Sequence, residues 1–389
     1  ADAFGVEVEG PSYSGWGTTI GVLGEGYMRA ATQHPILDHV SLPLHFFNGL
    51  PVRAETGEVL ATVLNAHQQE TPRAALVEHR TNRGRTLLLA PDVTGTVVHI
   101  QQGTAVTRDR VPSDDGIGGC NDLVLKSEDG AVLDYIFDRQ SLPEIPGYRA
   151  FFEPIADLWR EVLLRAILYC ARAADVAVPV LWLYPRNVPA LGHISHDTDG
   201  NDVPHGEMIL DALTEAGVKS TWCTIVPGYP RELTRRIEGA GHELAMHYDA
   251  VSEHCPWSRE LFDRQFDDLT ALFGRPPVSN KNHYLRWEGD TDFFDWCLRR
   301  GIQMDSSKGP SKTGFAGFNF GTCHPHLPVA PEGGTLDVFE LPTLSQDLCV
   351  FAPPVIADKL IAASHRVHGI CHLLFHPAHI DKPGVRDAF

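Results

Sequence analysis

The stretch Gly192-His-Ile-Ser-His-Asp-Thr-Asp-Gly200 decides the fold, because two carboxylates stand where an apolar run ends and a turn begins. Its first four residues continue the Val- and Leu-rich run of residues 176–184 and predict a short buried strand that ends at Asp197. Asp197 and Asp199 are then expected at the carboxyl end of the strand, where α/β sheets bind ligands. Two such close carboxylates indicate a cation site. The alternative is that they only form the turn before Gly200.

The composition favours a large soluble protein. The chain has 389 residues, 43% hydrophobic and 21% charged, which is long enough for two domains. Its net charge of −18 argues against nucleic acids and anionic membranes as partners. The eight cysteines lack a Cys-x-x-Cys pair, so reduced, buried thiols are expected. No apolar window is long enough for a membrane span, and a cytoplasmic location is favoured over a secreted one.

The first half of the chain reads as one domain, residues 1–177. It carries short β-like runs at residues 43–47, 58–64, 75–79 and 85–90, and a long helical pattern at residues 153–174. The apolar run at 85–90 is expected to be a strand buried on both faces, as in a parallel sheet. Three prolines between residues 178 and 189 place the domain boundary there.

The second half, residues 178–389, alternates strands with helices. Helices are expected at residues 207–216, 231–239, 259–273, 292–300 and 356–368, and further strands at 218–225, 242–247, 302–305, 338–341 and 370–375. This order predicts a parallel sheet, either doubly wound or closed into a barrel.

Several of these strands end in polar residues. His247 ends the strand at 242–247, His376 follows the last strand, and the loop at residues 280–287 adds a histidine, an arginine and two aromatic residues. Single histidines at such places are usually structural. Several strand ends that share this chemistry favour one polar cluster in a cleft.

The order of these motifs resembles the polysaccharide deacetylase family, the NodB-like carbohydrate esterases. The resemblance covers about residues 190–385 and rests on the motifs His196-Asp-Thr-Asp-Gly200, Gly241-His-Glu-Leu-Ala-Met-His247 and Leu374-Phe-His-Pro377. It implies a distorted (β/α)7 barrel that removes N-acetyl groups from an amino sugar or polysaccharide. It also implies that Asp197 is the general base, Asp199 and His247 bind a divalent metal, and His376 is the general acid.

The chain departs from the family at one metal ligand. The usual second metal histidine stands four residues after the first, and here that position is Val251. His283 is our expected third ligand, with Asp249 and His254 as alternatives. The expected metal is Zn²⁺, or another divalent ion such as Co²⁺, Ni²⁺ or Mn²⁺.

Substrate contacts are expected from four residues near these motifs. Tyr284, Trp287 and Trp222 could stack on a sugar ring, and Arg286 could orient Asp197 or a substrate oxygen. Packing at the rim of the barrel is the alternative for the aromatic residues.

The first domain resembles, more loosely, the flavodoxin-like amidotransferase-like domain also found as a trimerisation module in β-galactosidases. The matching pieces include Ala1-Asp-Ala-Phe-Gly-Val6 and Gly84-Arg-Thr-Leu-Leu-Leu-Ala-Pro-Asp92. In that family the opening motif falls within the domain, so the first strands are expected to be missing here. No Gly-x-Cys-x-Gly elbow surrounds Cys120 or another cysteine, so a structural or homo-oligomerising role is expected instead of catalysis.

Two other functions stay open from the sequence. One is hydrolysis of a small cyclic or linear amide, as in allantoinase-like relatives of the same family. The other is a carbohydrate-binding or scaffold protein without catalysis, which the valine at position 251 suggests.

Overall fold

The computed structural model describes residues 2–9, 24–81, 84–109, 122–252, 256–312 and 314–389. His254, Cys120 and Cys255, which figured in the predictions, lie outside these residues. The chain divides into two compact units, one formed by residues 1–101 and 155–187 and the other by residues 102–154 and 188–389. We call them unit 1 and unit 2 and describe each by itself.

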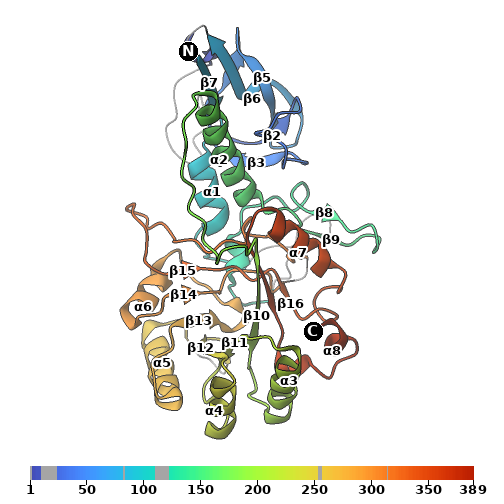
Figure 1. Ribbon diagram of the computed structural model, residues 1–389. Helices are drawn as coiled ribbons and strands as arrows, with labels where there is room; N and C mark the ends of the chain where they lie inside the picture. Colours follow the sequence, from blue (N-terminus) through green and yellow to red (C-terminus); the bar gives the residue numbers. More distant parts are fainter. Residues whose placement is uncertain (1, 10–23, 82–83, 110–121, 253–255, 313) are drawn as a thin grey trace. The chain divides into compact units, whose positions relative to one another are not determined.

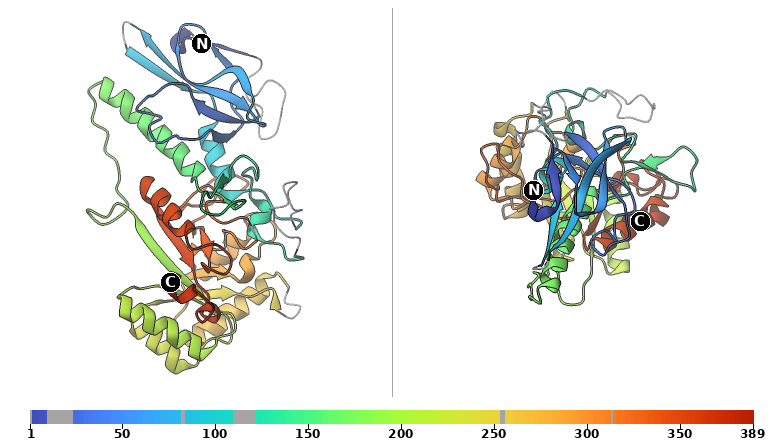
Figure 2. Two further views of the ribbon diagram at one scale, coloured as in Figure 1. Left: turned by 90° about the vertical axis from the view of Figure 1, so that its right-hand side faces the viewer. Right: turned by 90° about the horizontal axis from the view of Figure 1, so that it is seen from above.

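Unit 1 contains an antiparallel sheet of five strands in the order β3-β2-β5-β6-β7. The strands are β2 (Glu25–Ala30), β3 (Leu44–Phe47), β5 (Glu58–Asn65), β6 (Glu70–Thr81) and β7 (Gly84–Leu89). A second, two-stranded sheet pairs β1 (Val6–Val8) with β4 (Val52–Ala54). Helices α1 (Val93–Gln102) and α2 (Ile155–Ala173) complete the unit. Figure 2 shows α2, in green, beside the blue strands.

The antiparallel sheet corrects the expected flavodoxin-like domain, whose sheet would be parallel. The connection from β5 to β6 shows the reason. It is a tight turn in which the side chain of Asn65 accepts hydrogen bonds from the backbone amides of His67 and Gln69. Such a turn can join only antiparallel neighbours, since a parallel crossover needs a dozen or more residues. The strand β7 is also an edge strand with partly exposed leucines, so the prediction that it is buried on both faces is wrong.

Helix α2 covers part of this sheet with one apolar side. Its buried residues include Ile155, Trp159 and Val162, which recur at helical spacing. The indole nitrogen of Trp159 donates a hydrogen bond to the backbone oxygen of His45 on β3, at 2.7 Å. The helix is therefore fixed to the sheet by burial and by a polar contact.

Unit 2 is organised around a parallel sheet of eight strands in the order β15-β14-β13-β12-β11-β10-β17-β16, curved into a half-barrel. Its strands are β10 (Leu191–Asp197), β11 (Thr221–Thr224), β12 (Glu243–Tyr248), β13 (Ser279–Asn282), β14 (Met304–Asp305), β15 (Phe339–Glu340), β16 (Ser345–Gln346) and β17 (Ile370–Leu374). In the described part of the chain β15 and β16 end the sheet and do not pair with each other, so the expected closed barrel of seven strands is not confirmed.

The helices of unit 2 follow the predicted alternation. They are α3 (Val203–Ala216), α4 (Arg231–Gly239), α5 (Arg259–Phe273), α6 (Asp292–Arg300), α7 (Ile356–Arg366) and the short α8 (Val385–Ala388). Helices α3, α4 and α5 lie in sequence along the strands β10 to β13 (Figure 1). Glycines in the left-handed conformation end α3, α5 and α6.

The described residues between 102 and 154 belong to unit 2, whereas the predicted boundary assigns them to the first domain. They carry the short pair β8 (Gln140–Ser141) and β9 (Arg149–Ala150). The amide of Val106 donates to the oxygen of Gly289 at 2.8 Å, and the amide of Phe151 donates to the oxygen of Ala316 at 2.9 Å. The compact units are thus discontinuous in sequence, unlike the predicted domains.

Alternation along the strands of unit 2 separates a helix-facing core from a polar concave face. Trp222, Leu244 and Met246 belong to the apolar core shared with α3 to α6. Their neighbours point to the opposite face, because successive side chains of a strand alternate. Asp197 and His247 are among these concave-face residues, so two chain segments far apart in sequence contribute to one polar surface.

No helix in the described ranges is long and apolar enough to span a bilayer. None of the six described cysteines forms a disulfide, and four of them are buried.

Candidate active site

Asp199, His247 and His283 converge at the carboxyl end of the central strands. Asp199 follows β10, His247 lies near the end of β12, and His283 follows β13. One carboxylate oxygen of Asp199, Oδ1, lies 3.4 Å from Nε2 of His247 and 3.7 Å from Nε2 of His283. The three ligand atoms lie within 4.8 Å of one another.

Each histidine of this group is held through its other ring nitrogen. Nδ1 of His247 donates to the backbone oxygen of Lys281 at 2.8 Å, and Nδ1 of His283 donates to Oδ1 of Asp249 at 3.0 Å. These partners place the proton on Nδ1 and leave the lone pair of Nε2 directed at Asp199. Such outer partners are typical of histidines that bind metals.

The donor set fits a divalent cation. Nε2 of His247 and Oδ1 of Asp199 are buried and have no hydrogen-bond partner among the described residues. Ligands bound tetrahedrally at ~2.0–2.2 Å lie roughly 3.3–3.5 Å from each other, close to the separations from Asp199. Two imidazoles and one carboxylate also match the ligand types of catalytic zinc sites.

The electrostatics of the group favour a positive charge at its centre. Burial lowers the pKa of His247, but the carboxylates of Asp197 and Asp199 outweigh it and raise the pKa above its usual value. Burial likewise opposes ionisation of Asp199, yet His247, His376 and His283 hold the pKa of Asp199 well below its usual range. A site that stabilises an imidazolium in this way also attracts a metal ion.

The geometry distinguishes between the proposed third ligands. Among the described residues His283 directs a ring nitrogen at Asp199, whereas Oδ1 of Asp249 accepts from His283 and from the amides of Val251 and Ser252. Asp249 therefore orients His283. After His283 the chain turns sharply through Tyr284 and Leu285, both with positive φ. Strained conformations of this kind concentrate at functional sites.

Asp197 lies beside this group and has a partner that the sequence did not suggest. Its Oδ2 lies 3.8 Å from Nε2 of His247, and its Oδ1 lies 3.5 Å from Nζ of Lys281. The side chain of Lys281 is fully buried and also donates to Oγ of Ser195 at 2.8 Å. The buried ammonium of Lys281 therefore fixes the direction of the Asp197 carboxylate. The signal for this contact in the sequence was a lysine within a short polar run, and that run forms strand β13 in the structure.

His376 faces Asp199 from the opposite side. Its Nε2 lies 3.7 Å from Oδ2 of Asp199, and its Nδ1 bonds to Oδ2 of Asp347. Asp347 also accepts from the backbone amide of His376 at 2.7 Å and from Nδ1 of His379 at 2.8 Å. Burial lowers the pKa of His376, but Asp347 outweighs it and raises the pKa to about 9. Asp347 was missed because the two-residue strand β16 before it leaves no periodic pattern, and His379, three residues after His376, was not singled out.

The structure corrects two of the predicted substrate contacts. Trp222 and Trp287 are 0% and 1% exposed and belong to the apolar core behind the sheet, so neither indole can stack on a substrate. Tyr284 is 52% exposed next to the ring of His283 and remains available. Arg286 pairs with Glu288 at 2.5 Å and is not brought to Asp197.

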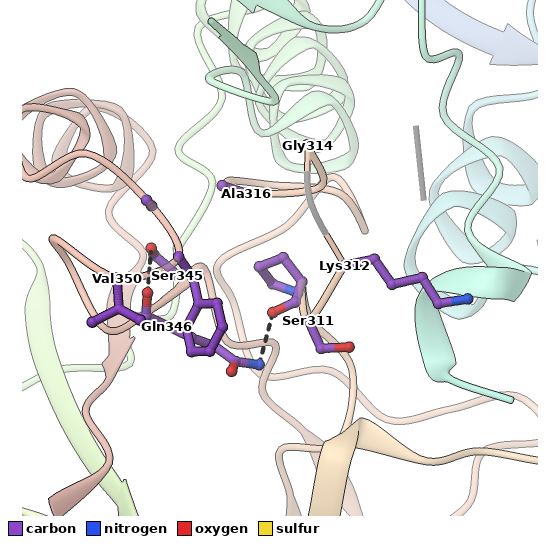
Figure 3. A pocket seen from close by; sticks show the side chains of 10 residues that line it. Ser311, Lys312, Gly314, Ala316, Ser345, Gln346 and Val350 are labelled. Atoms are coloured by element: carbon purple, nitrogen blue, oxygen red, sulfur yellow. Dashed lines mark hydrogen bonds between the residues drawn. The ribbon is translucent and has the colours of Figure 1, made fainter. Parts of the chain in front are cut away.

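A pocket of about 220 Å³ opens close to His376 (Figure 3). It lies between the chain after β14, including Ser311, and the strand β16 with Ser345 and Gln346. The amide of Gln346 donates to the oxygen of Pro310 at 2.8 Å, while Lys312 points away from the pocket. Phe351 lines the pocket, and its ring centre lies 6.5 Å from that of His376. The pocket thus adjoins the histidine that faces Asp199.

No protein-family model matches the sequence, and the comparison with curated proteins finds no similar one. Among solved structures, a Mycobacterium smegmatis protein described as a polysaccharide deacetylase is 20% identical, with a TM-score of 0.39, and the match covers 55% of this chain and 84% of that chain. A Bordetella bronchiseptica protein described as a polysaccharide deacetylase involved in O-antigen biosynthesis is also 20% identical, with a TM-score of 0.36 and coverage of 51% and 75%. An allantoinase is 15% identical, with a TM-score of 0.39 and coverage of 55% and 85%. Because these identities and TM-scores are low, the similarities carry no functional argument, and the proposal below rests on the side chains of the site.

Proposed function

We propose that unit 2 is a metal-dependent hydrolase that removes N-acetyl groups from an amino sugar or polysaccharide. The observation that carries this proposal is the convergence of Asp199, His247 and His283, with both histidines held through Nδ1. A scaffold protein would have no need of a buried imidazole nitrogen without a hydrogen-bond partner, such as Nε2 of His247, which is costly in a folded chain.

Asp199, His247 and His283 would hold the cation, most simply Zn²⁺ because two nitrogens and one oxygen are its usual catalytic ligands. A bound Zn²⁺ supplies a Lewis acid, which polarises a carbonyl and makes water a stronger acid. Co²⁺, Ni²⁺ and Mn²⁺ are the other candidates.

Asp197 is the proposed general base. It lies next to the proposed metal ligand His247, and the ammonium of Lys281 lies 3.5 Å from its Oδ1. Its role is to take a proton from the water that attacks the amide carbon. Lys281 is a positioning residue, since its ammonium reaches Asp197 and Ser195 and its backbone oxygen holds Nδ1 of the proposed ligand His247.

His376 is the proposed general acid. With a pKa of about 9 it carries a proton at neutral pH, which is the state needed to protonate the departing amine. Asp347 holds the ring through Nδ1, so the proton available for transfer is on Nε2, the atom that faces Asp199.

The sugar that carries the amine would occupy the pocket next to His376, on the leaving-group side. Ser345 and Gln346 can hydrogen-bond hydroxyl groups there, and the exposed ring of Phe351 can pack on a sugar face. The volume suits a single sugar ring, which favours recognition of one residue of a glycan at this place.

The test measures bound metal and product release on the same preparations of the full chain. Chelator-treated protein, reloaded with Zn²⁺, should bind one ion and release acetate from N-acetylglucosamine oligomers. His247→Ala should lose the metal, whereas the exposed Asp211→Asn on α3 should retain both properties. Metal binding together with turnover of allantoin alone would favour the small-amide hydrolase. Failure to bind Zn²⁺, Co²⁺, Ni²⁺ or Mn²⁺ would refute the proposal and favour the scaffold.

A further inference from the structure

Unit 1 contains an arginine-lined surface pocket that is independent of the proposed hydrolase site. It measures about 530 Å³ and is lined by Pro35, Arg85 of β7, and Arg165, Leu168, Tyr169, Arg172 and Ala173 of α2. We call these seven residues the arginine pocket. Pockets of this volume accommodate small organic ligands.

One wall of the arginine pocket is held in place from behind by a buried carboxylate. Glu78 of β6 is 1% exposed, and its Oε1 accepts from the hydroxyl of Tyr169 at 3.1 Å and lies 3.2 Å from Nη1 of Arg85. The guanidinium of Arg85 lies 4.6 Å from the centre of the Tyr169 ring. The ring of His34 packs edge-on against the same tyrosine at 4.7 Å. The aromatic wall and its cation are therefore positioned before any ligand arrives.

The other two arginines retain hydrogen-bonding capacity. Nε of Arg165 lies 3.7 Å from Glu161, and its Nη1 lies 3.5 Å from the oxygen of Pro35, so both contacts are long. Arg172 is exposed, and its guanidinium forms no hydrogen bond or ion pair with any residue that the structure describes. Each guanidinium offers five donors in a planar fork that matches a carboxylate or a phosphate.

The charge around the arginine pocket is positive, whereas the net charge of the whole protein is negative. The chain has a net charge of −18, yet Arg85, Arg165 and Arg172 line one pocket and Arg80 lines the adjoining one. Among the described residues, the carboxylates that contact these arginines are Glu78 and Glu161. Four cations against two anions leave a local excess of positive charge. On an acidic protein such an excess attracts anions at this pocket and repels them elsewhere.

We propose that the arginine pocket binds a small organic anion, a carboxylate or phosphate carried on a ring. The anionic group lies between Arg165 and Arg172, where free donors face it, and the ring packs on Leu168 and Tyr169. Arg85 is already engaged by Glu78 and Tyr169, so it contributes charge and stacking more than new hydrogen bonds. Neutral sugars satisfy the apolar wall but not the guanidinium forks.

Ligand-observed saturation-transfer NMR on the full chain tests this, with D-glucuronate, glucose 6-phosphate, glucose and inorganic phosphate as probes. Glucuronate or glucose 6-phosphate should bind at least about tenfold more tightly than glucose, and the better of the two identifies the anionic group. Arg172→Gln and Arg165→Gln should each weaken that binding about tenfold or more, and added salt should weaken it further. Arg160→Gln, on the same helix but outside the pocket, should change nothing. Equal binding of all four probes, or binding unchanged in Arg172→Gln and Arg165→Gln, would overturn the proposal. Neither result depends on metal content or on acetate release, so failure here is distinct from failure of the hydrolase.

Discussion

Asp249→Asn is expected to weaken metal binding although Asp249 is not a proposed ligand. Asp249 accepts from Nδ1 of His283 at 3.0 Å, and it accepts from the amides of Val251 and Ser252 at 2.9 and 3.1 Å. All three donors bond to the same oxygen, Oδ1. An asparagine retains an oxygen for these donors and loses only the negative charge that makes His283 a better electron donor.

The expected loss of zinc affinity depends on whether a substitution removes only the negative charge of Asp249 or also its hydrogen bonds. Loss of an outer partner of a metal-bound histidine weakens metal affinity about 10- to 100-fold. Asp249→Asn, which keeps the acceptor, should fall near the lower end, about tenfold or ~1.4 kcal/mol. Asp249→Ala, which also frees the ring of His283, should approach about 100-fold or ~2.7 kcal/mol. Zinc affinity can be measured by competition with a chromophoric chelator.

Asp347→Asn is the matched control, because Asp347 holds His376 as Asp249 holds His283. It should lower the rate of acetate release and leave zinc affinity within about twofold of the wild type, since His376 is the proposed acid and not a ligand. The reasoning fails if Asp249→Asn binds zinc as tightly as the wild type. It also fails if Asp347→Asn loses as much affinity as Asp249→Asn.

Four further predictions concern the base, its partner, acid stability and the core. Asp197→Asn should keep one bound zinc and lower kcat about 10²- to 10⁴-fold, and unchanged turnover would remove Asp197 from the role of base. Lys281→Met should lower kcat without loss of zinc and destabilise the fold by about 3–5 kcal/mol in urea titration, because it leaves Asp197 buried without its cation; a wild-type midpoint would contradict this. Burial lowers the pKa of His196 to about 3, below the value of 6.5 taken for the unfolded chain, so the unfolded state binds the proton first. Stability is then full above pH 6.5 and falls as the pH drops toward 3, by on the order of 5 kcal/mol; His196→Gln should flatten this pH dependence. Trp222→Ala should cost about 3–5 kcal/mol of stability, whereas Tyr284→Ala should cost under about 0.5 kcal/mol, and equal losses would be inconsistent with their burial.

The sequence predicted the strand and helix order of unit 2 because long amphipathic helices carry a strong period. The helices α4, α5 and α6 match the predicted ranges from residue to residue. The strands β13 and β16 were not predicted. The run Ser279–Asn282 is polar throughout, and β16 has only two residues, so neither shows the apolar pattern by which a buried strand is recognised.

The same weakness hid the partners of the site residues. Asp197, Asp199, His247 and His376 were singled out as candidates because they stand at the ends of recognisable motifs. Lys281 and Asp347 lie close to these residues because of how the strands pair in the sheet. Strand β13 is the neighbour of β12, and β16, which precedes Asp347, is the neighbour of β17. Pairings between distant strands are not encoded in local spacing. The burial of Trp222 was missed for a related reason, since a one-residue change in strand phase decides which face a side chain occupies.

Unit 1 shows where periodicity misleads about sheet type. The run Arg85 to Ala90 is apolar enough for a central parallel strand, yet β7 is an antiparallel edge strand. An apolar run reports burial and does not report the direction of its neighbour. The length of the connections was the better guide, because the few residues between the runs of this unit cannot form crossovers.

Asp199 links the two halves of the candidate active site, and this determines which substitution isolates the metal. Its Oδ1 faces His247 and His283, while its Oδ2 lies 3.7 Å from Nε2 of the proposed acid His376. Asp199→Ala would therefore remove a ligand and also disturb His376, so lost turnover could not be assigned to metal loss. His283→Ala touches only the ligand side. It should lower zinc affinity more than Asp249→Ala, because it removes the donor and not merely its support. Equal zinc affinity in His283→Ala and the wild type would show that the cation, if bound, is held without His283.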